Sequence, residues 1–162
     1  LAVEKGVHTL LAAWRQIDYP LVIIGEGPLE DEVIEASRNN KNIYYKGALP
    51  REAVLAEFSK CRFVVVPSIY HEPFGLVNIE AMSVGTPVLG AAIGAMETLI
   101  EPEKTGLLFM PNNEEDLRQK AYRFINDDQL SSQMGEHARE YYLQKFTPQK
   151  NYEKLIQIYK DC

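Results

Sequence analysis

Two glutamates with seven residues between them, Glu72 and Glu80, mark the most informative stretch of the sequence. Glu72 follows an apolar run, and Glu80 lies inside a helix predicted to start at Gly75. Free backbone N–H groups at a helix start attract phosphate, whereas carboxylates accept hydrogen bonds from sugar hydroxyls. The pattern therefore fits a phosphorylated sugar ligand, with one carboxylate on a ribose and one on a hexose, as well as it fits a purely structural interpretation. The alternative is a glutamate that favours the helix dipole plus a surface glutamate.

Two other predicted strand ends fit the same ligand. Gly25 and Gly27 form a turn where a backbone can approach a ligand closely, although a tight strand-to-helix turn also explains them. Lys5 precedes a helix and could neutralise a diphosphate, although a solvated lysine is the plainer interpretation. A dinucleotide fingerprint would place a third glycine where this chain has Glu30 and an acidic residue near Lys46. The turn therefore disfavours an oxidoreductase.

Short apolar runs alternate with amphipathic stretches up to residue 109. Runs such as 64–66 lack polar alternation, as strands covered on both faces do. Alternating strands and helices imply parallel pairing through right-handed crossovers. The predicted fold is α/β, a doubly wound, Rossmann-like parallel sheet that binds ligands outside the carboxyl ends of its strands. The predicted strands are 21–24, 42–46, 62–67, 87–91 and 106–109. The predicted helices are 29–39, 50–60, 75–84, 94–100, 113–126, 130–145 and 148–160.

The composition fits one soluble globular domain, with 162 residues, of which 46% are hydrophobic and 25% charged. The net charge of −6 disfavours a nucleic-acid partner. Apolar runs such as 63–66 are too short to span a bilayer, and the opening residues show no signal peptide. Cys61 and Cys162 match no metal or redox spacing; they are expected to be one buried and one tail thiol. A chain so poor in cysteine fits a reducing compartment, so we expect a cytoplasmic protein.

The order and spacing of the motifs resemble the C-terminal domain of glycosyltransferase family 4, the retaining transferases of the GT-B fold. The segment from Glu72 to Glu80 matches that family's pair of glutamates with seven residues between them. The resemblance covers nearly the whole chain. Its other pieces are Glu4-Lys5-Gly6-Val7 in an opening helix, Gly25-Glu26-Gly27-Pro28, Glu80-Ala81-Met82, Gly85-Thr86-Pro87-Val88, Glu97, Gly106-Leu107-Leu108, and Phe146-Thr147 to Tyr159 in a closing helix.

The resemblance implies a catalytic role for two residues. Lys5 would contact the diphosphate of the donor, and Glu72 would hold hydroxyls of the transferred sugar. The implied reaction moves a hexose from a nucleoside-diphosphate sugar with retention at the anomeric carbon. A lysine and helix-terminal N–H groups would stabilise charge on the leaving diphosphate without a metal or other cofactor. Asp127-Asp128 lies between predicted helices, where a solvated turn is expected rather than a metal site.

The resemblance also implies a donor-binding surface. Glu80 would bind the ribose, the backbone of Leu49 would meet the base, and Arg51 would stack on the base. The remaining donor contacts would come from the glycine turn and from the start of the helix after Glu72, at Gly25, Phe74, Gly75, Leu76 and Val77.

The resemblance further implies that residues 1–162 are a donor-binding domain without its partners. A first strand, central in the sheet, and a glycine-arginine pair would come just before Leu1. An N-terminal domain would bind the glycan, lipid or small-molecule acceptor and make any peripheral membrane contact. The fragment alone is therefore expected to be inactive. At Gly94-Ala95-Met96 the chain departs from the family, because the usual glycine-rich run beside the sugar is reduced.

Other functions share these residues. An epimerase or phosphorylase could use the same scaffold, although no phosphorylase cofactor lysine motif is seen. A relative that binds nucleotide sugars without activity is disfavoured by the presence of both glutamates. The closing helix adds an apolar stripe at helical spacing. Packing of this stripe on its own domain is the preferred interpretation, and contact with the absent domain is the alternative. The stripe consists of Tyr152, Leu155, Ile156 and Tyr159.

Overall fold

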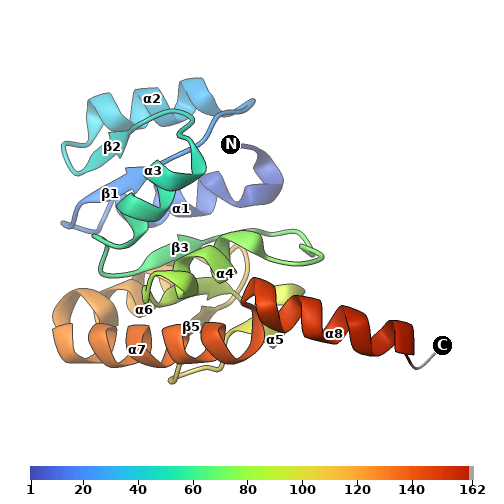
Figure 1. The fold of residues 1–162 in the computed structure, drawn as a ribbon. Helices are drawn as coiled ribbons and strands as arrows, with labels where there is room; N and C mark the ends of the chain where they lie inside the picture. Colours follow the sequence, from blue (N-terminus) through green and yellow to red (C-terminus); the bar gives the residue numbers. More distant parts are fainter. Residues whose placement is uncertain (161–162) are drawn as a thin grey trace.

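The structure, a computed structural model, describes residues 1–160 and alternates strands with helices in the predicted order (Figure 1). The strands are β1 (Leu21–Ile23), β2 (Ile43–Tyr45), β3 (Val64–Val66), β4 (Val88–Ala91) and β5 (Gly106–Phe109). The helices are η1 (Val3–Lys5, a 3-10 turn), α1 (Val7–Trp14), α2 (Glu30–Asn39), α3 (Arg51–Phe58), α4 (Leu76–Ser83), α5 (Ala95–Leu99), α6 (Glu114–Asn126), α7 (Asp128–Lys145) and α8 (Pro148–Lys160). All predicted strands and helices are present, with ends shifted by a few residues.

The strands form two parallel sheets. β1 pairs with β2, whereas β3, β4 and β5 form a second sheet in that order. Within residues 1–160 no ladder of hydrogen bonds joins β1 to β3, which are the strands nearest each other in Figure 1. The parallel α/β prediction is confirmed, but the pairing is interrupted between these two strands.

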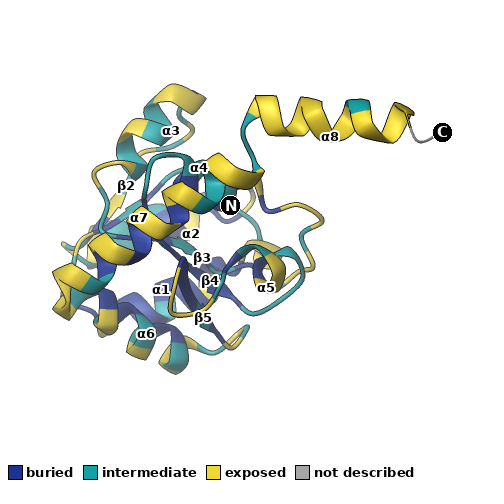
Figure 2. Ribbon diagram, turned by 60° about the horizontal axis from the view of Figure 1, so that its bottom comes forward, coloured by how far each residue is buried: buried dark blue, intermediate teal, exposed yellow. Residues whose placement is uncertain are grey.

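Helices cover both faces of the larger sheet. Figure 2 shows α4 and α7 on one side of β3, β4 and β5, and α1 and α6 on the other. One core joins the two sheets, because it contains Trp14 of α1, Ile23 of β1 and Phe109 of β5. Trp14 is 1% exposed, and its indole N–H donates to the Tyr19 carbonyl at 2.9 Å. A second hydrophobic cluster packs β3 against α4 and α5, so two clusters hold the strand ends that position the site.

Side-chain caps decide where two late helices begin. The Asn113 side chain accepts a hydrogen bond from the Asp116 N–H, so α6 begins at Glu114. The Asp127 side chain accepts from the Leu130 N–H, so α7 begins at Asp128, earlier than predicted. Asp128 pairs with Arg62 across the molecule. Both residues are exposed at the junction of α6 and α7, so the predicted solvated position between two helices is confirmed; one carboxylate caps α7 and the other is half of an ion pair.

Lys5 lies ahead of a helix, as the sequence predicts. The η1 turn ends at Gly6, which has φ 69° in the left-handed region, and α1 starts afresh at Val7. Pro50 likewise lies just before α3 as its N-cap residue, not inside its first turn. The break at Gly6 separates the turn that carries Lys5 from α1.

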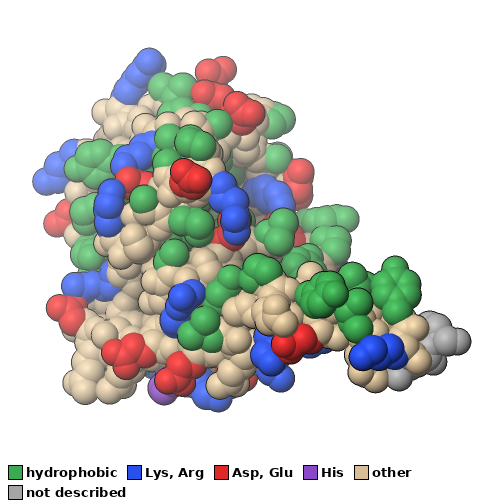
Figure 3. All heavy atoms as spheres, viewed as in Figure 1, with side chains coloured by type: hydrophobic (Ala, Val, Ile, Leu, Met, Phe, Trp, Pro, Cys, Tyr) green, Lys and Arg blue, Asp and Glu red, His purple; other side chains and the backbone are tan. Residues whose placement is uncertain are grey.

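The closing helix α8 projects from the rest of the fold (Figure 2). None of its residues is buried, and Tyr152 and Tyr159 are 60% and 72% exposed. Hydrophobic side chains gather along it in Figure 3. The preferred prediction, that the stripe packs on its own domain, is wrong. Cys61 is half-buried rather than buried, and Cys162 lies outside the described residues.

Candidate functional site

The opening turn η1 docks on the carboxyl end of β3. The Ile69 N–H donates to the Glu4 carbonyl at 2.9 Å, which ties η1 to the loop that follows the strand. Gly6 lies so close to Pro67 that a Cβ atom there would stand 1.8 Å from the Pro67 carbonyl oxygen. A residue with a side chain therefore does not fit at position 6 without movement. This contact brings Lys5 to the loop that carries Glu72.

Lys5, Ser68 and Glu72 form one hydrogen-bonded group. The Lys5 Nζ and the Ser68 Oγ both donate to Glu72 Oε1, each at 2.7 Å. Ser68 is 2% exposed, and the Glu72 side chain is 16% exposed. Burial acts to raise the pKa of Glu72, but the hydrogen bonds from Lys5 and Ser68 and the lysine charge outweigh it, so the pKa is lowered. Glu72 is thus held as a carboxylate.

The first turn of α4 presents unused donors beside this group. Gly75 caps the helix, and the N–H groups of Leu76 and Val77 make no hydrogen bond within residues 1–160. The side chains of Phe74 and Leu76 are 59% and 62% exposed, so this turn is open to a ligand. Three residues after Glu72, the chain therefore offers a place for an anion.

Glu80 lies further along α4 and pairs with a different cation. The Arg51 Nε donates to Glu80 Oε1 at 2.8 Å, which joins the first residue of α3 to α4. The Glu80 side chain is 22% exposed, and the Arg51 side chain is 72% exposed. Leu49 is half-buried in the loop between β2 and α3. Sequence reasoning placed Arg51 on a base and did not foresee its pairing with Glu80.

The glycine turn closes the other end of the site. The Gly25 N–H donates to the Gly47 carbonyl at 2.8 Å, so the carboxyl ends of β1 and β2 are joined. Gly27 lies against Leu1, and the Leu29 N–H donates to the Leu1 carbonyl at 3.0 Å. The segment 1–6 therefore runs along the carboxyl edge from the glycine turn to the end of β3. It connects Gly25 with Lys5 and Glu72 across the break between the sheets.

Three residues missed from the sequence support these groups. Ser68 was detectable as a hydroxyl directly after a strand. Gly94 was noted only as part of a reduced glycine run, but a Cβ atom added there would stand 3.1 Å from His71 Cα and 3.3 Å from the Glu72 nitrogen. The neighbouring Ala95 N–H donates to the Glu72 carbonyl at 3.3 Å. Asn78 is 0% exposed, and neither atom of its amide has a hydrogen-bond partner. Its signal was a polar residue on the buried face of α4.

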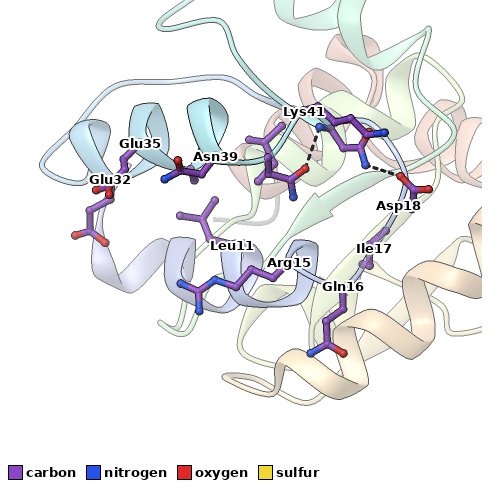
Figure 4. A pocket seen from close by; sticks show the side chains of 13 residues that line it. Leu11, Arg15, Gln16, Ile17, Asp18, Glu32, Glu35, Asn39 and Lys41 are labelled. Atoms are coloured by element: carbon purple, nitrogen blue, oxygen red, sulfur yellow. Dashed lines mark hydrogen bonds between the residues drawn. The ribbon is translucent and has the colours of Figure 1, made fainter.

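A separate hollow lies away from these residues. A groove of about 650 Å³ runs between α1 and α2, where Leu11 and Arg15 face Glu35 and Asn39 (Figure 4). Its floor lies at the amino ends of β1 and β2, and no predicted site residue lines it. Ligands of doubly wound sheets bind at the carboxyl ends of the strands. We therefore assign the candidate site to the Lys5, Glu72 and Glu80 edge rather than to this groove.

Residues 1–160 contain neither a metal-binding group nor a helix that could span a membrane. No three side chains among their His, Cys, Asp and Glu residues gather in a group that could hold a metal ion. None of their helices combines the length and the apolar character needed to cross a membrane.

Relatives of known sequence share most of this chain. An uncharacterized glycosyltransferase of Methanocaldococcus jannaschii is 31% identical over 98% of the chain and 45% of its own length. The O-antigen chain mannosyltransferase C of Escherichia coli is 31% identical over 96% of the chain and 43% of its own length. The chain thus spans less than half the length of these relatives.

Solved structures agree with the fold. Sucrose-phosphate synthase from Thermosynechococcus elongatus is 30% identical with a TM-score of 0.89, over 99% of this chain and 43% of that one. TarM of Staphylococcus aureus, in a complex that contains UDP, is 25% identical with a TM-score of 0.86, over 97% of this chain and 33% of that one. The sequence profile of glycosyl transferases group 1 matches residues 1–141. The chain therefore belongs to the glycosyl transferases group 1 family, and its fold is that of the Rossmann-like half of a GT-B enzyme.

Proposed function

We propose that residues 1–162 are the donor-binding domain of a retaining, metal-independent glycosyltransferase. The protein would transfer a hexose from a nucleoside-diphosphate sugar to a glycan, lipid or small-molecule acceptor. The observation that carries the proposal is the Lys5–Glu72–Ser68 group, with contacts of 2.7 Å, beside the unused N–H groups of α4. This arrangement offers positive charge for a diphosphate and a fixed carboxylate for sugar hydroxyls at one edge.

The charges of the site fit a departing nucleoside diphosphate. As the bond to the sugar breaks, negative charge builds on the phosphate oxygens. The ammonium of Lys5 and the free N–H groups of Leu76 and Val77 are donors that can stabilise this charge without a metal. Lys5 has three N–H donors, so it can keep its bond to Glu72 while it contacts a phosphate.

The carboxylates fit the two sugars of such a donor. Glu72 accepts its two protein hydrogen bonds on Oε1, which leaves Oε2 for hydroxyls of the transferred hexose. Glu80 lies about one helical turn into α4 and contacts Arg51, so the ribose would lie here and the base beside Leu49. The relatives support this chemical class: one is named a mannosyltransferase, and the TarM complex contains UDP.

The domain assignment rests on separate observations. Among the described residues, β1 and β3 have no strand partner on their facing edges, as expected if a further strand completes the sheet there. The relatives are more than twice as long as the match, so an acceptor domain has room in the longer protein. The exposed stripe of α8 supplies a surface for that domain. The low cysteine content supports a cytoplasmic location.

A transfer assay on the full-length protein tests the proposal. UDP-, GDP- and ADP-hexoses would be offered with a panel of glycan, lipid and small-molecule acceptors, with and without EDTA. We expect one donor to be consumed, NMR to show a product with the anomeric configuration of the donor, and EDTA to have no effect. An inverted product or a requirement for a divalent cation would overturn the mechanism. Donor binding without transfer to any acceptor would favour a binding-only relative.

The Lys5→Ala variant tests whether the transfer activity depends on this site. We expect it to lose transfer, whereas Lys150→Ala, on the exposed helix α8, is expected to keep it. Equal activity of both variants would remove Lys5 from the mechanism.

A further inference from the structure

Arg51 is held by Glu80 in a way that points to a task other than contact with a base. Its Nε donates to Glu80 Oε1 at 2.8 Å. The contact crosses from the first residue of α3 to the middle of α4, over 29 positions of sequence. A contact between two helices at the predicted donor site fixes the relative position of the groups that would line it.

The position of Arg51 is unfavourable for its own helix. A cation in the first turn opposes the helix dipole, which prefers negative charge at that end. α3 buries none of its residues completely, so packing does not require arginine there. The Glu80 side chain is 22% exposed but the Arg51 side chain is 72% exposed, so solvent screens the pair from the arginine side and its contribution to stability is small. The pair therefore is not explained by helix or fold stability.

The pair leaves the second oxygen of Glu80 available. Arg51 occupies Oε1, and no partner of Oε2 appears within residues 1–160. Glu72 has the same arrangement, because Lys5 and Ser68 both donate to its Oε1. Both carboxylates are thus anchored through one oxygen and free at the other. Anchoring reduces the side-chain freedom that Glu80 would otherwise lose when it binds a hydroxyl.

We infer that Arg51 is a positioning residue, which orients Glu80 so that its free oxygen accepts hydrogen bonds from the ribose hydroxyls of the donor. The inference rests on the proposed function, because it needs a nucleotide at this edge. It replaces the expectation that Arg51 stacks on the base. Because its Nε is bound to Glu80 Oε1, Arg51 would act through Glu80, and its effect on binding would then depend on the ribose.

Deoxynucleotides separate these roles. Calorimetric titration of the full-length protein would use UDP, GDP and ADP beside their 2′-deoxy forms. The wild type is expected to prefer the ribonucleotide by about tenfold, the size of one charged hydrogen bond. Glu80→Ala should abolish this preference, and Arg51→Ala should reduce it severalfold while the deoxynucleotide binds almost unchanged. The double variant should behave as Glu80→Ala does, because the two residues act as one unit.

A distant pair supplies the control. Arg123 donates to both oxygens of Glu103 at 2.6 and 2.7 Å, far from the site in sequence and fold, so Arg123→Ala should leave the preference unchanged. Thermal unfolding midpoints of Arg51→Ala and wild type should agree, which excludes a general loss of structure.

Each other outcome overturns the inference. If Arg51→Ala weakens ribo- and deoxynucleotides equally, Arg51 contacts the base or phosphate. If Arg51→Ala binds the ribonucleotide or the deoxynucleotide more tightly than wild type does, the Arg51–Glu80 pair blocks the site instead of preparing it. If Arg51→Ala keeps the wild-type preference for ribonucleotides while Glu80→Ala abolishes it, Arg51 has no positioning role, and the proposed function stands. If Glu80→Ala binds as wild type does, or no nucleotide binds to wild type, the proposed function itself fails.

Discussion

Replacing Gly6 by alanine tests how the structure delivers Lys5 to the site. Gly6 has φ 69°, a conformation that costs a residue with a Cβ atom roughly 1–2 kcal/mol. The added Cβ would also lie 1.8 Å from the Pro67 carbonyl oxygen and 2.7 Å from its carbonyl carbon. Relief of such overpacking costs about 1–3 kcal/mol. Gly6→Ala should therefore reduce the free energy of unfolding by about 2–5 kcal/mol.

Gly47→Ala is the matched control. Gly47 has φ 67°, nearly the same conformation, but the nearest atom to an added Cβ is the Tyr45 hydroxyl oxygen at 4.0 Å. Only the conformational part, roughly 1–2 kcal/mol, applies there. Alanine also reduces the entropy of the unfolded chain, and this effect cancels between the two variants.

Urea unfolding of both variants gives the comparison. We expect Gly6→Ala to lose about 1–3 kcal/mol more than Gly47→Ala, since only Gly6 faces backbone atoms. Equal losses would refute the close contact between Gly6 and Pro67, and with it the account of how Lys5 reaches Glu72.

Three further predictions test other parts of the structure. Gly135→Ala should lower the free energy of unfolding in urea by about 1–3 kcal/mol, because the added Cβ would lie 2.2 Å from the Gly85 carbonyl oxygen. Since alanine favours helices over glycine, a gain in stability would contradict the packing of α7 on α4. Because the pKa of Glu72 is lowered from 4.5, its contribution to stability is present above the unfolded-state pKa and lost as pH falls through the folded value. The stability difference between wild type and Lys5→Met should accordingly shrink below about pH 4.5, and a difference independent of pH would exclude the Lys5–Glu72 contact. Removal of α8 should leave the unfolding midpoint unchanged, since none of its residues is buried. Trypsin should cut the chain first within α8, unless the longer protein covers this helix. Equal cleavage of α8 in the longer protein would count against an interdomain contact.

The sequence predicted the elements well because their signals are local. Apolar runs such as Val64 to Val66 fix the strands, and Glu72 falls in the loop after one strand and Glu80 inside the next helix, as expected. The carboxyl edge could be chosen from topology alone. These inferences need only the spacing of residues near one another in the chain.

Contacts between distant segments were not accessible in this way. The partners Lys5 and Glu72 stand 67 positions apart, and their contact depends on the break at Gly6 and on the hydrogen bond from Ile69. The Arg51–Glu80 pair depends on how α3 leans on α4, which no local pattern encodes. The prediction for α8 was wrong for the same reason. An apolar stripe indicates that a helix has a face to bury, but not which part of the protein covers that face.

A calorimetric titration with UDP, GDP and ADP tests the central claim most directly, since it decides where a nucleotide binds. It would compare wild type with Glu80→Ala at the proposed site and Glu35→Ala in the groove between α1 and α2. We expect one diphosphate to bind wild type and Glu35→Ala alike, and to lose at least about tenfold in affinity for Glu80→Ala. Wild-type affinity in Glu80→Ala together with loss of binding in Glu35→Ala would contradict the assignment and move the ligand to the opposite end of the strands.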